Sequence, residues 1–316
     1  MLMAIATLLP LFALDAGPTA PRVAVFAPGP PFDPVFRGFQ EGMAKLGYVN
    51  SRNIFFLAEN TKGDTAYLIN RARTLIEGQP SVLFTVSTPH TAAAMKATST
   101  LPIVFAWTGD PVQSGFIVSY ATPKKNLTGV SSYAGPLAGK RLEILKEIDP
   151  KIKNVLALVA SKDIVAEPSY EFLELTAKRI GVHIVRSDVS SKTDIERALQ
   201  AARKDSFDAI YHVPSSLVGV NIKLLIKKSL REGLPLVVHE ESMVEQGALF
   251  TYAPDFNLVG YQAARLVAKV LNGEKPSGIP AETPEKLRFV VNLNTARAIK
   301  LKLSPEILER ADRVVE

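Results

Sequence analysis

Cysteine is absent from the 316-residue sequence. Its absence excludes disulfide bonds, thiolate metal sites, cysteine nucleophiles and the attachment of a lipid to an N-terminal cysteine. Histidine is scarce: the four histidines are His90, His183, His212 and His239, and none lies three or four residues from another. Because metal-binding helices usually carry histidines at that spacing, we expect no metal site.

Charge of one sign is not concentrated anywhere in the chain. No run of five or more like charges occurs, and the formal net charge of +6 is mild for this length. Nucleic-acid binding would need a basic stripe with side chains that read bases or grooves, so we expect no nucleic-acid partner. The apolar fraction of 47% and the charged fraction of 22% are typical of soluble globular proteins. The length suffices for two domains of ordinary size.

The sequence has no long hydrophobic run except at its start. The first fourteen residues, MLMAIATLLPLFAL, carry no charge, but a bilayer span needs ~20 apolar residues. The stretch resembles the hydrophobic region of a secretory signal, with small residues at cleavage spacing between Ala13 and Ala16, although no Lys or Arg precedes it. Pro10 disfavours a buried helix here. We therefore expect residues 1–21 to be a signal-like leader and the protein to be periplasmic, without a cysteine anchor.

Common catalytic motifs are missing as well. The sequence contains no G-x-S-x-G, S-x-x-K or G-x-G-x-x-G. The segment Gly135–Arg141 has three residues between its glycines where a phosphate-binding loop has four, so we interpret it as the start of a helix. The run His239-Glu240-Glu241 begins like a zinc-binding helix, but Met243 stands where the second histidine is needed. We therefore expect no cofactor and no enzymatic activity.

Acidic residues at the ends of predicted strands keep one enzymatic alternative open. Asp110, Glu240, Glu241 and Asp255 follow or end strand-like segments. An acid at a strand end is more often a helix cap or a turn former. The alternative is a two-lobed α/β hydrolase or lyase that uses Asp110 together with Glu240 or Glu241.

Short apolar strands alternate with amphipathic helices along most of the chain, which is typical of parallel, doubly wound sheets. The first half predicts strands at 22–26, 53–58, 82–86 and 103–107, with helices at 33–46, 65–77 and 91–97. The second half predicts strands at 155–159, 182–186, 209–213 and 236–239, with helices at 137–148, 169–180, 195–204 and 220–232. An extended segment at 248–252, a long helix at 256–271, a strand at 287–293 and helical turns at 296–299 and 305–314 follow.

The stretch from Leu101 to Tyr133 lies between the two alternating patterns, and we interpret it as the passage from one lobe to another. The predicted fold class is α/β, with two doubly wound parallel-sheet lobes joined by a multi-stranded hinge. Lobe one is expected to contain residues 22–130 plus about 253–280. Lobe two is expected to contain residues 131–252, and the tail at 281–316 is not assigned to either lobe.

Ligands of open α/β sheets bind outside the carboxyl ends of the strands, and this rule selects the candidate site. The helix after Ser87-Thr88 either binds a ligand carboxylate with its N-terminal amides or is simply capped, and the same holds at Ser215-Ser216. Trp107 belongs to a core or stacks on a ligand, and an acid such as Asp255 or Glu240 would receive an ammonium. Such a set suits an amino-acid-like or aromatic solute. The candidate ligand-binding residues are Pro31, Phe32, Ser87, Thr88, Trp107, Asp110, Tyr133, Ser161, Ser215, Ser216, Glu240, Tyr252 and Asp255.

Several short motifs resemble one family over the whole length from about Arg22 to Glu316. They are FRGFQEG from Phe36, LGY from Leu46, RNI from Arg52, LPIVF from Leu101, GDPV from Gly109, NLTGV from Asn126, GKRLE from Gly139, YAPD from Tyr252, NLNTA from Asn292 and RAD from Arg310. The chain is similar in these motifs to the substrate-binding proteins of tryptophan/tyrosine ABC transporters, which have the periplasmic-binding-protein type I fold.

The resemblance implies an exported, two-lobed receptor that closes on a small molecule and presents it to a membrane permease. We expect it to work as a monomer by hinge closure. Besides the hydrolase or lyase, a second alternative is a sugar-type repressor core of the same architecture. A repressor would need a DNA-binding helix-turn-helix, whereas the N-terminus carries a hydrophobic leader.

Overall fold

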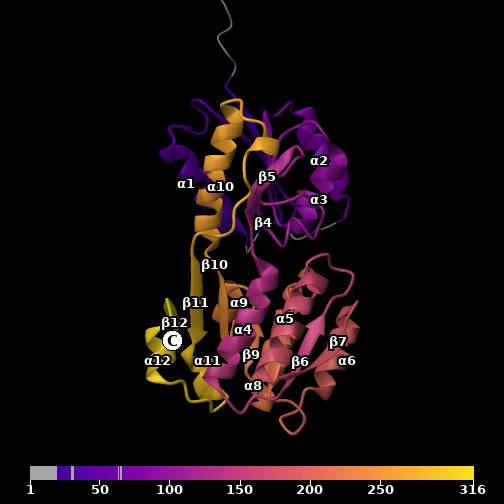
Figure 1. Ribbon diagram of the computed structural model, residues 1–316, viewed down its shortest axis with the longest axis vertical. Helices are drawn as coiled ribbons and strands as arrows, with labels where there is room; N and C mark the ends of the chain where they lie inside the picture. Colours follow the sequence, from indigo (N-terminus) through magenta and orange to yellow (C-terminus); the bar gives the residue numbers. More distant parts are fainter. Residues whose placement is uncertain (1–19, 30–31, 63, 65) are drawn as a thin grey trace, which may run out of the picture.

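The computed structural model of the chain describes residues 20–29, 32–62, 64 and 66–316, which form two lobes stacked along the long axis of the molecule (Figure 1). The predicted leader, apart from its last two residues, and Pro31 lie outside the described residues. Each lobe contains a β-sheet covered by helices on both faces, so the predicted two-lobed α/β fold is confirmed.

The first lobe is built on a parallel sheet with the strand order β2-β1-β3-β4-β5. Its central strands are continuously apolar and buried, as expected of a parallel sheet with helices on both faces. Helices α2 and α3 cover one face, and α1 and α10 cover the other. The strands are β1 (Arg22–Ala27), β2 (Phe55–Asn60), β3 (Val82–Val86), β4 (Ile103–Thr108) and β5 (Leu127–Ser131), and the helices are α1 (Asp33–Lys45), α2 (Leu68–Glu77), α3 (Thr88–Ala97) and α10 (Phe256–Leu271).

The second lobe contains a mixed sheet with the order β12-β11-β10-β9-β8-β6-β7. Its parallel strands β6 to β10 agree with the prediction, but β11 runs antiparallel to β10. The strands are β6 (Asn154–Val159), β7 (His183–Asp188), β8 (Ala209–His212), β9 (Leu236–Val238), β10 (Phe250–Pro254), β11 (Leu287–Asn292) and β12 (Arg313–Val315). Helices α4 (Ala134–Ile148), α5 (Ala166–Ile180), α11 (Leu293–Ala298) and α12 (Pro305–Glu309) cover one face. Helices α6 (Lys192–Ala201), α7 (Ser216–Val220), α8 (Ile222–Glu232) and α9 (Glu241–Glu245) cover the other, and a short 3₁₀ turn, η1 (Pro276–Gly278), follows α10.

The C-terminal tail joins the sheet of the second lobe. The helical turn predicted over 305–314 is wrong beyond Glu309, because Arg313–Val315 pair with β11 as a parallel edge strand. The Asp312 carboxylate accepts a hydrogen bond of 2.8 Å from the Phe289 amide and so fixes the turn that precedes this strand. The last valines are β-branched, which suits a half-buried strand.

Segments at 131–134, 254–256 and 282–287 of the described chain pass between the lobes (Figure 1). The first and third are bonded to each other, because the Ser131 amide donates to the Glu282 carbonyl at 2.9 Å and the Glu282 amide donates to the Gly129 carbonyl at 2.8 Å. The second leads from β10 into α10, so a helix from the C-terminal half completes the first lobe. The lobes are therefore linked by more than one segment of the described chain.

Helix α10 lies against α1 at very close range. Gly38 faces the Asn257 carbonyl oxygen, and Gly260 faces the Val35 carbonyl oxygen, so a Cβ atom at either position would overlap main-chain oxygen. Small residues allow this close approach of two helix backbones. The contact holds the returning chain on the first lobe and so fixes one end of the segment that passes between the lobes.

We predict that Gly38→Ala or Gly260→Ala lowers the free energy of unfolding by about 1–3 kcal/mol, because the helices must separate. The loss would exceed the gain of about 1 kcal/mol that alanine brings to a helix. Urea denaturation followed by circular dichroism measures the change. Gly278→Ala is the control, because open space surrounds that position. Unchanged stability in both helix variants would contradict the close contact.

Candidate functional site

A cavity of about 600 Å³ lies between the two lobes. Many of its lining residues lie at or just beyond the carboxyl ends of strands in both sheets: Ser87 follows β3, Gly109 follows β4, and Asp163 and Glu240 lie in the segments after β6 and β9. This is where open α/β sheets bind ligands, and the size is within the usual range of small-molecule sites.

The candidate residues predicted from the sequence divide into two groups. Those that line the cavity are Phe32, Ser87, Thr88, Trp107, Ser215, Ser216 and Glu240. Those that are described but do not line it are Asp110, Tyr133, Ser161, Tyr252 and Asp255. The cavity also has lining residues that the prediction did not include, among them Leu137, Arg141, Asp163, Val165, His239 and Met243.

A buried histidine organises the polar wall of the first lobe. His90 Nδ1 lies 2.9 Å from the Ser87 hydroxyl, and His90 Nε2 lies 3.1 Å from the Thr61 hydroxyl. Burial, and to a lesser extent the positive charge of Arg71, lowers the pKa of His90 to about 4. The ring is therefore neutral at pH 7, with one nitrogen donating and the other accepting. Ser87 has a φ of 79°, and its side chain makes no capping hydrogen bond to α3. Its hydroxyl is oriented by His90 instead.

The hydroxyls at the other predicted helix starts have different partners. The Thr88 hydroxyl accepts a hydrogen bond of 2.9 Å from the Gly109 amide and so ties the ends of β3 and β4 together. The Ser215 hydroxyl accepts from the Val218 amide at 3.4 Å, which is the capping alternative for that position.

Trp107 is part of the core of the first lobe and also lines the cavity. The residue has a φ of 56° at an irregularity of β4, and its side chain is 7% exposed. Its ring lies edge-on to Phe256, with centroids 3.7 Å apart, and Phe32 stacks on Phe256 at 5.5 Å. Left-handed backbone in a bulky residue is uncommon and clusters at binding sites. The result is an aromatic wall, formed by Phe32 and Trp107 and backed by Phe256.

Carboxylates line the cavity on the second lobe. Asp163 is occupied by its own chain, because its oxygens accept from the Ser216 amide at 2.9 Å and the Val165 amide at 3.1 Å. Glu240 is 4% exposed, and its polar neighbours are His239 Nε2 at 3.2 Å and the Ser242 hydroxyl at 3.5 Å. Glu240 therefore keeps more of its hydrogen-bonding capacity for a ligand than Asp163 does.

Arg141 was not predicted as a site residue, and it is the buried cation of the cavity lining. It is 1% exposed, and its Nη2 atom has no hydrogen-bond partner among the described residues. A signal was present in the sequence: Arg141 falls on the same face of α4 as the buried Leu137, Ala138 and Leu145. A cation within an apolar stripe either pairs with an acid or faces a functional cavity.

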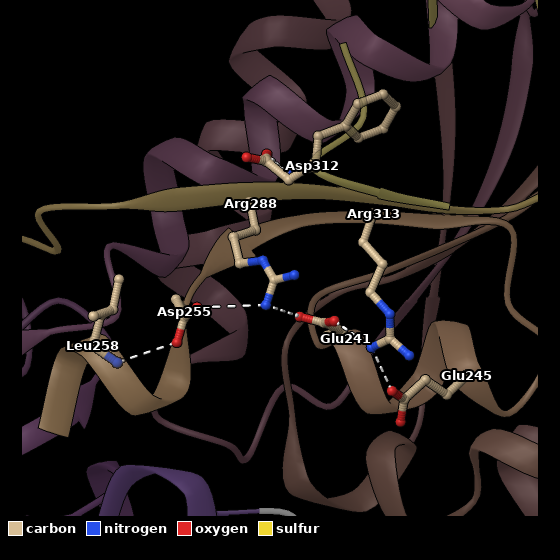
Figure 2. A network of polar contacts seen from close by, with 8 residues as sticks. Glu241, Glu245, Asp255, Leu258, Arg288, Asp312 and Arg313 are labelled. Atoms are coloured by element: carbon tan, nitrogen blue, oxygen red, sulfur yellow. Dashed lines mark hydrogen bonds and ion pairs between the residues drawn. The ribbon is translucent and has the colours of Figure 1, made fainter. Parts of the chain in front are cut away.

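The structure does not bring together the acid pair of the enzymatic alternative, because only Glu240 of Asp110, Glu240 and Glu241 lines the cavity. Figure 2 shows Glu241 within a network of charges, where Arg288 lies 3.3 Å and Arg313 2.6 Å from its carboxylate. The same Arg288 contacts Asp255 at 3.4 Å, and Asp255 caps α10 by accepting from the Leu258 amide at 3.1 Å. Asp110 forms a turn by accepting from the amides of Val112 and Gln113.

The other predicted residues outside the cavity lining have structural surroundings. Tyr133 precedes α4 with a φ of 54° and is 38% exposed, and Ser161 is exposed after β6. The Tyr252 ring packs against the core of the second lobe, and its carbonyl accepts a hydrogen bond from Arg141.

The described residues offer neither a metal site nor a membrane-spanning helix. They contain no group of three or more His, Asp or Glu side chains arranged to hold a metal ion. Within the same part of the chain, no helix combines the length and apolar character that crossing a membrane requires.

The fold and the interlobe cavity define a class: the two-lobed solute-binding proteins of periplasmic-binding-protein type I architecture. A family model described as "ABC transporter substrate binding protein" matches residues 22–315, and the chain belongs to this family. The resemblance found in the motifs is thereby confirmed. The protein is a substrate-binding component of an ABC transporter and not an enzyme.

Individual relatives agree with the family. A conserved domain protein from Vibrio cholerae has 28% identity and a TM-score of 0.86, and the match covers 93% of this chain and 99% of that one. An ABC domain from Streptococcus pneumoniae in complex with L-Trp has 22% identity and the same TM-score and coverage. The tyrosine-binding protein of Clostridioides difficile is 26% identical over 88% of this chain and 80% of its own.

We predict that acid destabilises the folded protein partly through His90. Its pKa is about 4 when folded and about 6.5 when unfolded, so the unfolded state binds more protons between these values. Stability is therefore lost as the pH falls through this window, by about 2 kcal/mol between pH 7 and pH 5 from this residue. Urea denaturation at both pH values would show a loss smaller by that amount in His90→Gln. The exposed His183→Gln is the matched control, and an equal loss in both variants would contradict the prediction.

Proposed function

We propose that this protein is an extracytoplasmic receptor that binds an amino-acid-like, aromatic solute in the interlobe cavity and delivers it to the permease of an ABC importer. The observation that carries the proposal is the combination of a buried cation, a buried acid and an aromatic wall in one cavity, formed by Arg141, Glu240, Phe32 and Trp107. An aromatic amino acid has matching groups: a carboxylate, an ammonium and a planar side chain. The names of two relatives, one tyrosine-binding and one solved with L-Trp, support this class.

Delivery requires that the receptor change shape when it is loaded. The segments that pass between the lobes permit a hinge motion, and a ligand that contacts both walls favours the closed arrangement. We propose that the receptor acts as a monomer in the periplasm and that the leader at 1–21 directs its export. Lysine and glutamate residues on both lobes remain exposed for contact with the permease.

We predict that L-tyrosine or L-tryptophan stabilises the protein against heat and is not consumed. Ligand at a hundredfold excess over Kd adds about 2.7 kcal/mol to the free energy of unfolding. Differential scanning fluorimetry measures the shift, and mass spectrometry of the incubated mixture measures the amount of ligand left. Arginine and glucose at the same concentration serve as controls. Consumption of the stabilising compound would contradict the receptor function, and the absence of a shift with either aromatic amino acid would contradict the ligand class.

We also predict that Glu240→Gln weakens binding of the same amino acid roughly 10- to 100-fold, because a charge-assisted hydrogen bond to the ammonium is lost. Isothermal titration calorimetry gives the Kd of each variant. Glu171→Gln, which changes an exposed acid on α5, is the matched control. A Kd for Glu240→Gln equal to that of the control would remove Glu240 from the site.

A further inference from the structure

The guanidinium of Arg141 is held in one orientation by the chain around it. Its Nε donates to the Tyr211 hydroxyl oxygen at 3.3 Å, and its Nη1 donates to the Tyr252 carbonyl at 3.0 Å. Tyr211 can accept because its own proton goes to the Ala138 carbonyl at 2.7 Å. Tyr252 lies on β10, two residues before the passage into α10, so the guanidinium is anchored to a strand that leads into the hinge.

Arg141 forms no ion pair with another residue in the described part of the chain, although the acid Glu240 lines the same cavity. None of the ion pairs formed by the described residues includes Arg141, and its Nη2 atom is buried without a hydrogen-bond partner. Burial raises the pKa of the Tyr211 phenol, and burial lowers that of His212 well below its ordinary value, so both neighbours are neutral at pH 7.

A buried charge without a partner is strongly unfavourable, and a protein normally pairs such a charge or replaces it. Here the side chain lines a cavity of small-molecule size, so the partner can come from outside the chain. The guanidinium fork matches a carboxylate in shape and charge.

We infer that Arg141 is the specificity-determining residue that binds the free α-carboxylate of the solute, through the Nη2 group that the protein leaves unpaired. The inference rests on the proposed function, since it assumes an amino-acid-like ligand. It excludes ligands whose carboxylate is blocked, such as amides, esters and internal peptide residues. Arg141 and Glu240 together would then require a zwitterion, and the aromatic wall would select the side chain.

The experiment compares acids with their carboxamides in the full-length protein. L-Tyrosine, L-tryptophan and their carboxamides are titrated by calorimetry into the wild type, Arg141→Met and Arg141→Lys, at a pH that keeps every amine protonated. Lys140→Met is the matched control, because it removes a positive charge from the adjacent, partly exposed position of α4. Thermal melting by circular dichroism establishes that each variant is folded.

We expect the wild type and Lys140→Met to bind the acids roughly 10- to 100-fold more tightly than the carboxamides. Arg141→Met should lose this preference while it binds the carboxamides within about threefold of the wild type. Arg141→Lys should keep a reduced preference, because an ammonium supplies charge without the fork. The lysine variant also allows the inference to be tested if Arg141→Met does not fold.

The preference for acids over carboxamides decides the outcome. The assignment would be overturned if folded Arg141→Met kept the preference for acids, or if its affinities for acids and carboxamides fell equally. The receptor function would stand in either case. If only the lysine variant folds, a preference equal to that of the wild type would overturn the assignment too. A wild type that binds neither acids nor carboxamides would instead overturn the proposed ligand class, and the inference would fail with it.

Discussion

The structure of the cleft depends on a buried positive charge, the guanidinium of Arg141. One of its donors, Nη2, has no hydrogen-bond partner among the described residues. Arg141 can remain there because Tyr211 and the Tyr252 carbonyl satisfy part of the guanidinium. The remaining donor is unfavourable while it has no partner, and an anionic group in the cleft would satisfy it. Glu240 provides the opposite charge in the same cavity, so the cleft as a whole suits a ligand that carries both signs.

The fold brings these groups together from distant parts of the chain. Both sheets direct the ends of their parallel strands toward the cavity, and the loops after those strands, together with the helices that follow them, supply most of its lining. The Gly38 and Gly260 contacts hold α10 on the first lobe, while β10 belongs to the second. Arg288 links Asp255 at the start of α10 with Glu241, the neighbour of Glu240 (Figure 2). The cavity wall and the passage between lobes are therefore joined by direct contacts.

Much of the fold could be predicted from the sequence because local patterns encode it. The period of apolar residues located the strands of both lobes and helices such as α1 and α10, and the spacing of Gly135 and Gly139 correctly indicated a helix start. The edge strand β12 was missed because its three residues give too short a pattern, and its pairing with β11 is a long-range contact. The antiparallel direction of β11 could not be predicted, because the period of apolar residues locates a strand but does not give its direction relative to its neighbours.

The candidate site was less predictable, because identical residue types have different roles after folding. Ser87 and Ser215 both precede helices, but His90 orients the first and the second is a cap. Glu240 and Glu241 are neighbours, yet the first lines the cavity and the second pairs with arginines. The strand-end rule could not select Arg141, because the residue lies inside helix α4. Its unpaired donor becomes visible only when all neighbours are in place.

A crystal structure of the protein with L-tyrosine or L-tryptophan would test the central claim most directly. The ligand should lie between the lobes, with its carboxylate within hydrogen-bond distance of Arg141 Nη2, its ammonium at Glu240 and its ring against Trp107. Ligand density elsewhere, or a carboxylate bound by other groups while Nη2 remains unpaired, would contradict the claim.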